Sequence, residues 1–326
     1  MNEPPILKVS NLRKLFPMGK ARLWRARDQY VHAVDDVSFE LRRGEILALV
    51  GESGCGKSTL ALTLMGLEKP TAGTLIFEGQ DVTHLEGLKL KQMRRHIQMV
   101  FQDPYESLSP LMTIGQIVAE PLVVHGLARG KGERAERVRR ALEDAGLKPA
   151  EAFLNRFPHE LSGGQRQRVV IAGALVLEPS LLLADEPVSM LDVSIRAEIL
   201  NLLAELRATR GISILFITHD LATAAYFTDR VAVMYLGRIV EISPTREVLA
   251  NPAHPYTRAL LSVIPVPNPR QRRERIILQG DPPNPIDLPP GCRFHPRCPL
   301  AQPICREQDP MLRDVRDGHQ AACLLL

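Results

Sequence analysis

The sequence predicts an α/β fold with a mainly parallel β-sheet, an antiparallel β edge, an inserted helical subdomain and a small C-terminal module. Short, unbroken apolar runs indicate buried strands, and helical patterns between several of them indicate a parallel sheet. After residue 264, prolines become too frequent for long helices, which marks a linker into a small module. The apolar runs cover residues 46–50, 97–101, 181–184, 214–217 and 231–235.

The antiparallel edge is predicted from residues 6–9 and 37–41, which read as short strands. Between them, residues 17–30 have no clear period, carry several basic side chains and include Trp24 and Tyr30, which indicates an inserted loop. From about 104 to 178 the sequence is rich in helical patterns and offers no obvious core strand. We therefore expect a helical subdomain there.

A phosphate-binding loop follows the apolar run at 46–50. Gly51-x-x-x-x-Gly56-Lys57-Ser58 matches the pattern in which glycines let backbone N–H groups converge on phosphate oxygens at a helix N-terminus. Lys57 would neutralise phosphate charge and Ser58 would ligate Mg²⁺. A chance glycine-rich turn is disfavoured by the strand before it and the helix expected near Lys57. The predicted nucleotide contacts are Gly51, Ser53, Gly54, Cys55, Gly56, Lys57, Ser58 and Thr59.

Two acids end the apolar run at 181–184. Asp185 would hold Mg²⁺, and Glu186 would polarise the water that attacks the γ-phosphate. Seen alone, the pair could be solvated acids that cap a strand. The phosphate loop upstream favours the catalytic interpretation.

Leu161-Ser162-Gly163-Gly164-Gln165, with these two motifs, resembles the defining pentapeptide of the ATP-binding cassette (ABC) family. The resemblance covers residues 6–264 and implies a nucleotide-binding domain over residues 1–264. The Ser162 hydroxyl and the Gly163 and Gly164 amides, before a helix from about Gln165, would form a second anion site. In the family this site contacts the γ-phosphate of the ATP held by the opposite subunit.

Three further residues match family positions. Gln102 corresponds to the glutamine that senses Mg²⁺ and the attacking water, and His219 to the histidine that donates a hydrogen bond to the γ-phosphate. Phe16 stands where the family places the aromatic residue that stacks on adenine. Trp24 or Tyr30 could take that place, and Phe16 could be an ordinary core residue.

Four of the five cysteines lie near the C-terminus, at Cys292, Cys298, Cys305 and Cys323. In a reducing cytosol such a group favours metal binding over disulfides. The surrounding segment resembles the C-terminal extension of dipeptide and oligopeptide importer ATPases, whose members carry a [4Fe-4S] cluster. We expect this cluster in a module over residues 265–326, with zinc or reduced thiols as the alternatives.

Residues 101–110 and 251–261 also resemble the importer subfamily, and residues 104–112 are where a coupling helix of the permease would dock. The basic run of Arg270, Arg272, Arg273 and Arg275 is interpreted as a solvated face, with contact to anionic lipid as the alternative.

Composition and the resemblance together predict the partners and the location. No apolar run approaches the roughly 20 residues that cross a bilayer, so we expect a peripheral protein at the cytoplasmic face of the membrane. The net charge of +4 gives no support for nucleic acid as a partner. The resemblance implies a second ABC ATPase subunit, in the family usually a paralogue, two permease subunits and an extracytoplasmic solute-binding protein.

The predicted function is ATP hydrolysis that drives peptide import. Relatives of the subfamily import sugars or nickel as well, so those solutes stay open as alternatives. A soluble ABC ATPase of DNA repair or translation is disfavoured, because no duplicated cassette or long coiled coil is present. A non-catalytic module is disfavoured because Lys57 and Glu186 are both present.

Overall fold

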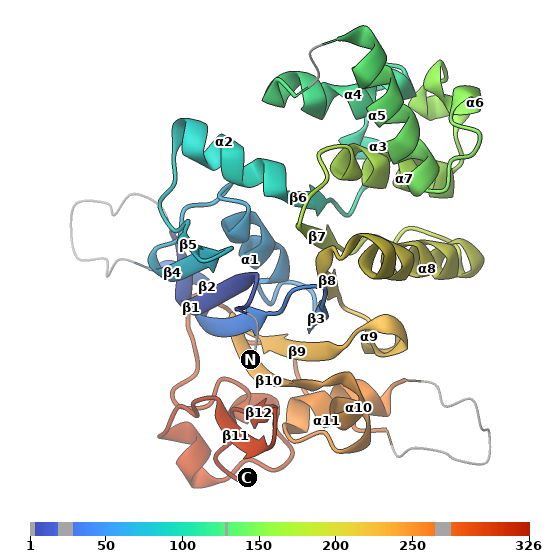
Figure 1. Cartoon of the computed structure of the whole chain (residues 1–326). Helices are drawn as coiled ribbons and strands as arrows, with labels where there is room; N and C mark the ends of the chain where they lie inside the picture. Colours follow the sequence, from blue (N-terminus) through green and yellow to red (C-terminus); the bar gives the residue numbers. More distant parts are fainter. Residues whose placement is uncertain (1–3, 19–28, 128–129, 265–274) are drawn as a thin grey trace. The chain divides into compact units, whose positions relative to one another are not determined.

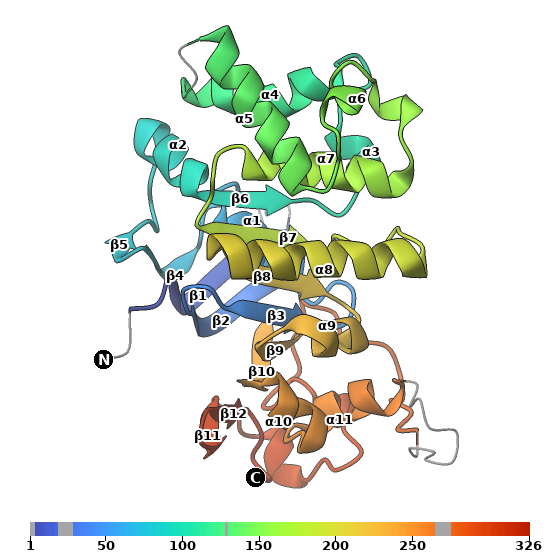
Figure 2. The same ribbon diagram turned by 45° about the vertical axis from the view of Figure 1, so that its right-hand side comes forward.

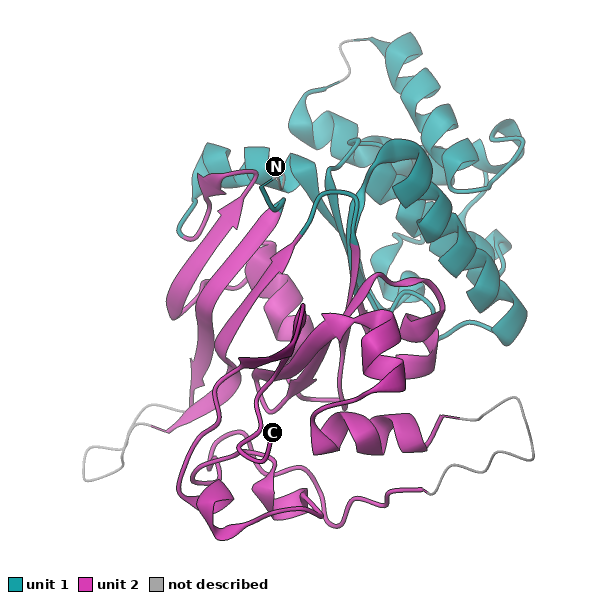
Figure 3. Ribbon diagram, turned by 60° about the horizontal axis from the view of Figure 1, so that its bottom comes forward, with its two compact units in different colours: residues 1–6, 42–45, 84–216 teal, residues 7–41, 46–83, 217–326 magenta. Residues whose placement is uncertain are grey.

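The computed structural model describes residues 4–18, 29–127, 130–264 and 275–326. Figures 1 and 2 show the chain in two views, and Figure 3 colours its two compact units. The first unit comprises residues 1–6, 42–45 and 84–216, and the second comprises residues 7–41, 46–83 and 217–326. Trp24 and Arg270, Arg272 and Arg273, which the sequence singled out, lie outside the described residues.

The second unit contains the predicted antiparallel edge. Strand β1 (Leu7–Pro17) pairs antiparallel with β2 (Tyr30–Leu41) on one side and with β4 (Ala72–Phe77) on the other. The short β5 (Gln80–Asp81) pairs with β4. Both predicted strands are longer than expected, because the alternation of apolar and polar residues breaks where β1 and β2 shift register.

A second group of strands in this unit carries the phosphate loop. Strand β3 (Ile46–Val50) is buried at every residue and pairs in parallel with β9 (Arg230–Tyr235). Strand β9 pairs antiparallel with β10 (Arg238–Pro244), which in turn pairs antiparallel with β12 (His319–Ala321). The remaining elements are β11 (Arg313–Arg316) beside β12 and the helices α1 (Lys57–Leu64), α9 (Leu221–Phe227), α10 (Thr245–Ala250) and α11 (Pro255–Ser262).

The C-terminal segment is held by the core of the second unit. Over residues 275–326 the structure contains the short 3-10 helices η2 (His295–Arg297) and η3 (Pro303–Arg306) and no α-helix, as the prolines predicted. Phe294 is 1% exposed and belongs to the same apolar cluster as Tyr235 and Tyr256. The segment therefore shares a core with β9 and α11 instead of forming one of its own.

The first unit begins its sheet with β6 (Ile97–Val100), which pairs in parallel with β7 (Leu181–Asp185). Strand β8 (Ser213–Thr218) lies beside β7, and the chain passes into the second unit at residue 217. Helices α2 (Gly87–His96) and α8 (Val193–Arg210) belong to the same unit.

The predicted helical segment occupies the rest of this unit (Figure 2). Helix α4 begins in a capping box formed by Thr113 and Gln116 and buries Ile114, Val118 and Leu122, which recur every four residues on one face. In the described part of residues 104–178 every element is a helix. These are α3 (Pro104–Ser107), α4 (Ile114–His125), α5 (Lys131–Asp144), α6 (Glu151–Leu154), η1 (Pro158–Glu160) and α7 (Gly163–Leu175).

No helix in the part of the chain that the structure describes is long and apolar enough to cross a membrane.

Candidate nucleotide-binding site

The phosphate loop joins the end of β3 to the start of α1, in the second unit, as the sequence predicted. The Lys57 side chain is buried and folds back over the loop. Its Nζ donates hydrogen bonds to the carbonyl oxygens of Gly51, at 2.8 Å, and Glu52, at 3.0 Å. Three residues of the loop are exposed, namely Ser53, Gly54 and Ser58, so backbone and hydroxyl groups face solvent there. The Lys57 side chain lies on the buried side of the loop.

Two glycines of the loop are required by close backbone contacts. A Cβ atom on Gly51 would lie 2.2 Å from the carbonyl oxygen of Met234, at the end of β9. A Cβ atom on Gly56 would lie 1.9 Å from the carbonyl oxygen of Ala33 in β2, and Gly56 has a φ of 106°. The loop is therefore packed against two strands so closely that a side chain does not fit.

Cys55, another predicted contact, is a buried thiol of the loop, and Thr59 is half-buried in α1. Burial raises its pKa, and the positive charge of Lys57, whose Nζ lies 3.8 Å from the Cys55 Sγ, opposes that effect only in part. Cys55 therefore serves as a small apolar side chain inside the loop.

The N–H, the carbonyl and the carboxylate of Glu52 each form hydrogen bonds, with partners both inside and outside the motif. Its N–H donates to the Tyr256 hydroxyl at 3.0 Å, and its carbonyl accepts from Lys57. Its carboxylate accepts two hydrogen bonds from Arg297, at 2.8 and 3.2 Å. Sequence reasoning missed both distant partners, although it had singled out residues 251–261 and the cysteine segment as markers of the subfamily.

His219 and Phe16 also lie in the second unit. His219 is exposed and directly follows β8, two residues before α9. The N-cap of α9 is Asp220, whose carboxylate accepts from the Ala222 N–H at 2.8 Å. Phe16 is half-buried in β1, with the Lys14 Nζ 4.6 Å from its ring centre, and Tyr30 is 38% exposed.

In the first unit, Gln102 and Glu186 meet although 84 residues separate them. The Gln102 Nε2 donates to a carboxylate oxygen of Glu186 at 3.4 Å. Glu186 follows the buried Asp185 at the end of β7 and has a φ of 46°, in the left-handed region that few side chains adopt. Its carbonyl accepts from the Ser189 hydroxyl at 3.0 Å, which fixes this turn. Strain at such a position is typical of functional sites.

The Ser162–Gln165 motif forms the N-terminus of α7, which begins at Gly163, two residues before the predicted start. The Ser162 hydroxyl accepts from the Gln165 N–H at 3.3 Å, and the Gln165 side chain accepts from the Ser162 N–H at 3.0 Å. Gly164 has no room for a side chain, because its Cβ would lie 2.5 Å from the Cγ2 of Ile195. The helix therefore starts in a capping box, with the amides of Gly163 and Gly164 at its positive end.

The described residues give no support for the metal site expected at the four C-terminal cysteines. No group of three or more His, Cys, Asp or Glu side chains that could hold a metal ion occurs among the described residues, which include all four cysteines. Cys292 and Cys298 pack against the apolar cluster around Phe294, and burial raises the pKa of both thiols, that of Cys292 to about 11. His295, whose Nδ1 lies 2.9 Å from the Cys292 carbonyl oxygen, is engaged locally. The iron–sulfur prediction for Cys292, Cys298, Cys305 and Cys323, and its zinc alternative, are therefore not supported.

Comparison with known proteins decides the family. The pattern described as "ABC transporter" matches residues 34–189, and "Oligopeptide/dipeptide transporter, C-terminal region" matches residues 240–305. A putative peptide import ATP-binding protein of Brucella ovis is 49% identical over 324 residues, which are 99% of each chain. The chain belongs to the ABC transporter ATP-binding subunits of the oligopeptide and dipeptide importer family.

Other relatives agree with this assignment to the ABC transporter family. The oligopeptide transport ATP-binding protein AppF of Bacillus subtilis is 48% identical, with 99% of this chain and 98% of that protein covered. A probable peptide ABC transporter ATP-binding protein of Sinorhizobium fredii is 50% identical, with 98% and 89% covered.

Solved structures of ABC cassettes confirm the predicted fold. A dimeric cassette in a post-hydrolysis state, bound to ADP and phosphate, has a TM-score of 0.65 at 33% identity and covers 74% of this chain and 99% of its own. The cbiO1 subunit of Clostridium perfringens has a TM-score of 0.66 at 33% identity, with 76% and 92% covered. The protein is an ABC ATPase with the ATP-hydrolysing fold of that family.

Proposed function

We propose that this ABC ATPase drives the import of dipeptides and oligopeptides through a separate membrane permease. The observation that carries the proposal is the match along 99% of the chain to peptide import ATP-binding proteins, including the C-terminal region characteristic of oligopeptide and dipeptide transporters. The catalytic residues named from the sequence supply the chemistry that such a subunit needs.

The phosphate loop has donors suited to ATP. Lys57 rests on two neutral carbonyl oxygens, and the oxygens of a phosphate would offer its ammonium group stronger, charged acceptors. The backbone amides of residues 51–59 and the exposed Ser58 hydroxyl complete the cradle at the N-terminus of α1. We assign Mg²⁺ to Ser58, Asp185 and Gln102. The ion would supply positive charge against the phosphates.

Hydrolysis requires a carboxylate that orients water, and Glu186 fits that role. Its carboxylate accepts a hydrogen bond from Gln102, so the amide would hold it in one orientation for orienting the attacking water and accepting its proton. Lys57 and His219 would stabilise the charge that develops on the phosphoryl oxygens. Phe16, half-buried on β1, is assigned to stack on adenine.

The N-terminus of α7 is assigned to the ATP of a second subunit. The amides of Gly163 and Gly164 stand at the positive end of a 13-residue helix, and the Ser162 hydroxyl can donate its own hydrogen while it accepts from Gln165. Ser162, Gly163, Gly164 and Gln165 would thus serve the partner's nucleotide. Two ATP molecules would be held between two ATPase subunits, with a paralogue as the second one.

The assembly we propose has two ATPase subunits, two permease subunits and an extracytoplasmic solute-binding protein, with this chain at the cytoplasmic face of the membrane. The segment at 104–112 is assigned to the coupling helix of the permease. Tyr105 is 57% exposed and Leu111 is 87% exposed, so apolar side chains are available there for a partner.

The catalytic assignment is tested with Glu186→Gln. Because the amide cannot accept a proton, phosphate release should fall by about 100-fold or more while ATP affinity, measured by titration calorimetry, stays near that of the wild type. Lys57→Ala serves as the matched variant that should lose ATP binding. Unchanged phosphate release in Glu186→Gln would contradict the assignment.

The substrate assignment needs the complex with its permease. The chain is co-expressed with the transmembrane subunits of its importer and reconstituted in vesicles with the solute-binding protein. Di- to pentapeptides should stimulate phosphate release. Stimulation by a disaccharide or by Ni²⁺ in place of the peptides would overturn the peptide assignment and leave the ATPase assignment standing.

A further inference from the structure

The C-terminal segment reaches the phosphate loop through an ion pair. Arg297, in η2, donates from both terminal nitrogens to the two carboxylate oxygens of Glu52, at 2.8 and 3.2 Å. The Arg297 side chain is 8% exposed and that of Glu52 29% exposed. Two parallel, charge-assisted hydrogen bonds with limited exposure fix the orientation of both groups. Glu52 is therefore tied to a residue 245 positions away in the sequence.

The backbone of Glu52 is held from the same side. Its N–H donates to the hydroxyl of Tyr256, which is fully buried in α11. The Tyr256 ring packs on Phe294 with a centroid distance of 5.4 Å, and on Tyr235 at 4.8 Å. Phe294 stands only three positions before Arg297. One buried aromatic cluster thus supports both contacts to the second residue of the phosphate loop.

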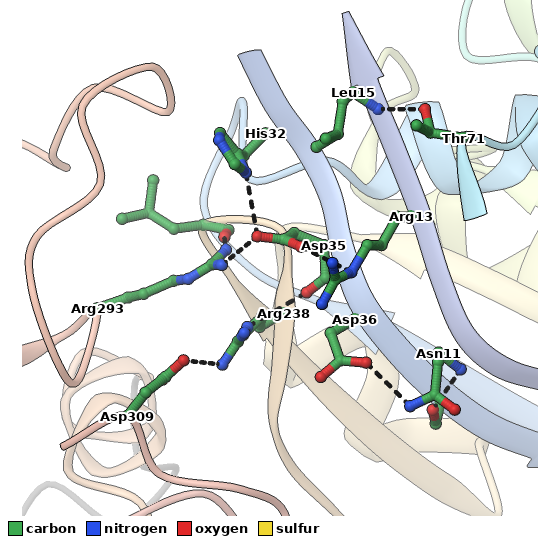
Figure 4. Close-up of polar contacts among 12 residues, drawn as sticks. Asn11, Arg13, Leu15, His32, Asp35, Asp36, Thr71, Arg238, Arg293 and Asp309 are labelled. Carbon is green, nitrogen blue, oxygen red and sulfur yellow. Dashed lines mark hydrogen bonds and ion pairs between the residues drawn. The ribbon is translucent and has the colours of Figure 1, made fainter. Parts of the chain in front are cut away.

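A second anchor holds the same segment to β2 (Figure 4). Arg293 forms an ion pair with Asp35 and donates to the Leu236 carbonyl at 2.5 Å, and both Arg293 and Asp35 are buried. Arg13 and His32 contact the same carboxylate, at 3.3 and 3.1 Å. The segment that carries Arg297 is therefore fixed by its own contacts, independently of Glu52.

The charge of Glu52 would oppose nucleotide binding if it were unpaired. Its carboxylate belongs to the residue next to Gly51, inside the loop that we assign to the phosphates of ATP. An uncompensated carboxylate near a polyphosphate raises the free energy of the bound state by Coulomb repulsion. Arg297 neutralises this carboxylate and keeps it turned toward η2.

We propose that Arg297 is a positioning residue for nucleotide binding, which acts through Glu52 to neutralise and orient the phosphate loop, so that the C-terminal segment sets the ATP affinity of this subunit. The inference rests on the nucleotide-binding role proposed above for the loop. It gives the C-terminal segment a task at the phosphate loop itself.

The test is equilibrium binding of ATP to the purified full chain, measured by titration calorimetry. Arg297→Gln leaves the Glu52 carboxylate unpaired and should weaken ATP binding about five- to tenfold, within the usual range of couplings between sites. Glutamine is smaller than arginine, so the substitution adds no volume beside the pocket of about 400 Å³ that both residues border. Arg306→Gln is the matched control, because Arg306 is an exposed arginine of the same segment and its loss should leave the affinity unchanged.

The decisive variant is the double substitution Glu52→Gln with Arg297→Gln. It removes the unpaired carboxylate, so ATP affinity should return to within about twofold of the wild type if the coupling is electrostatic. A purely structural role for the ion pair predicts no such recovery. Arg297→Lys, which keeps the charge and loses the paired geometry, should bind ATP with intermediate affinity and keeps the test available if the neutral variants fold poorly.

Two results would overturn the proposal. One is Arg297→Gln that binds ATP as tightly as Arg306→Gln; the other is a double variant that binds no better than Arg297→Gln alone. Failure of the proposed function is recognised separately, because the wild type would then bind no ATP, or Lys57→Ala would bind it as well as the wild type.

Discussion

Gly56 allows a test of how closely the phosphate loop is packed. A side chain added at Gly56 would meet neighbouring atoms, whereas one added at Gly54, two residues earlier, would not. In Gly56→Ala, the new Cβ would lie 1.9 Å from the Ala33 carbonyl oxygen, so β2 and the loop must separate by about 1.1 Å before the contact reaches 3.0 Å. The φ of 106° adds strain of about 1–3 kcal/mol, and overpacking adds about 1–3 kcal/mol. In Gly54→Ala, φ is 77° and no atom lies within 4 Å of the new Cβ, so the cost is about 1–2 kcal/mol.

The two variants should therefore differ in both stability and binding. For a unit of this size, we expect the thermal midpoint measured without nucleotide to fall by about 12 °C in Gly56→Ala and by about 4 °C in Gly54→Ala. A loop displaced by about 1 Å should also lose roughly 100-fold in reaction rate. Differential scanning calorimetry and phosphate release measure the two effects. Equal midpoints for the two variants, with normal activity in Gly56→Ala, would refute the packing argument.

Two further predictions concern buried polar contacts of the second unit. The Nε2 of His319 lies 2.7 Å from a carboxylate oxygen of Glu241, and both side chains are at most 1% exposed, so His319→Leu should destabilise the unit by about 2–3 kcal/mol in urea unfolding. His295→Leu, which removes one half-buried contact, should cost about 1 kcal/mol, and an equal loss in both variants would contradict this ranking. Burial alone would raise the pKa of Asp35, but Arg293, His32 and Arg238 together hold it below its usual value of 3.8. Asp35 therefore contributes stability above its unfolded pKa that is lost as the pH falls through its lower folded pKa. The difference in unfolding free energy between the wild type and Asp35→Asn should be constant above about pH 4.5 and narrow below it; a difference that widens toward acid would exclude this sign.

The sequence was sufficient for the parts of the fold that local pattern determines. The run at 46–50 is unbroken because β3 is buried on both faces, and its bounds were predicted to the residue. Strand β10 was not predicted, and neither were β11 and β12, which have four and three residues. Strand β11 pairs with the adjacent β12, but β12 pairs with β10, which is distant in the sequence and lies outside any local window.

Some features of the candidate site could likewise be predicted from local sequence, and others depend on contacts between distant residues. The loop that begins at Gly51 and the two acids at the end of β7 are each short runs of neighbouring residues, so they could be predicted from their spacing and from the strands before them. The Gln102–Glu186 contact was anticipated only as two family positions, and Arg297 was not recognised as a partner of Glu52 because nothing in its neighbourhood indicates a charge at the phosphate loop. The cysteine spacing suggested a metal site, but among the described residues no group that could hold a metal ion is found, and Cys292 and Cys298 pack against the apolar cluster of Phe294.

The pairing of β12 with β10 has a consequence for any shortened form of the protein. Strand β10 bonds to β9 on one side, and its other side is covered by Gln320 and Ala321. Without those residues, the N–H and C=O groups of an apolar strand would lie open at the margin of the sheet, where a strand of another molecule can add. Gln320 and Ala321 therefore occupy the edge of β10 at which a strand of another molecule could otherwise pair. A truncation that removes the cysteine segment together with these two residues should expose that edge and favour self-association.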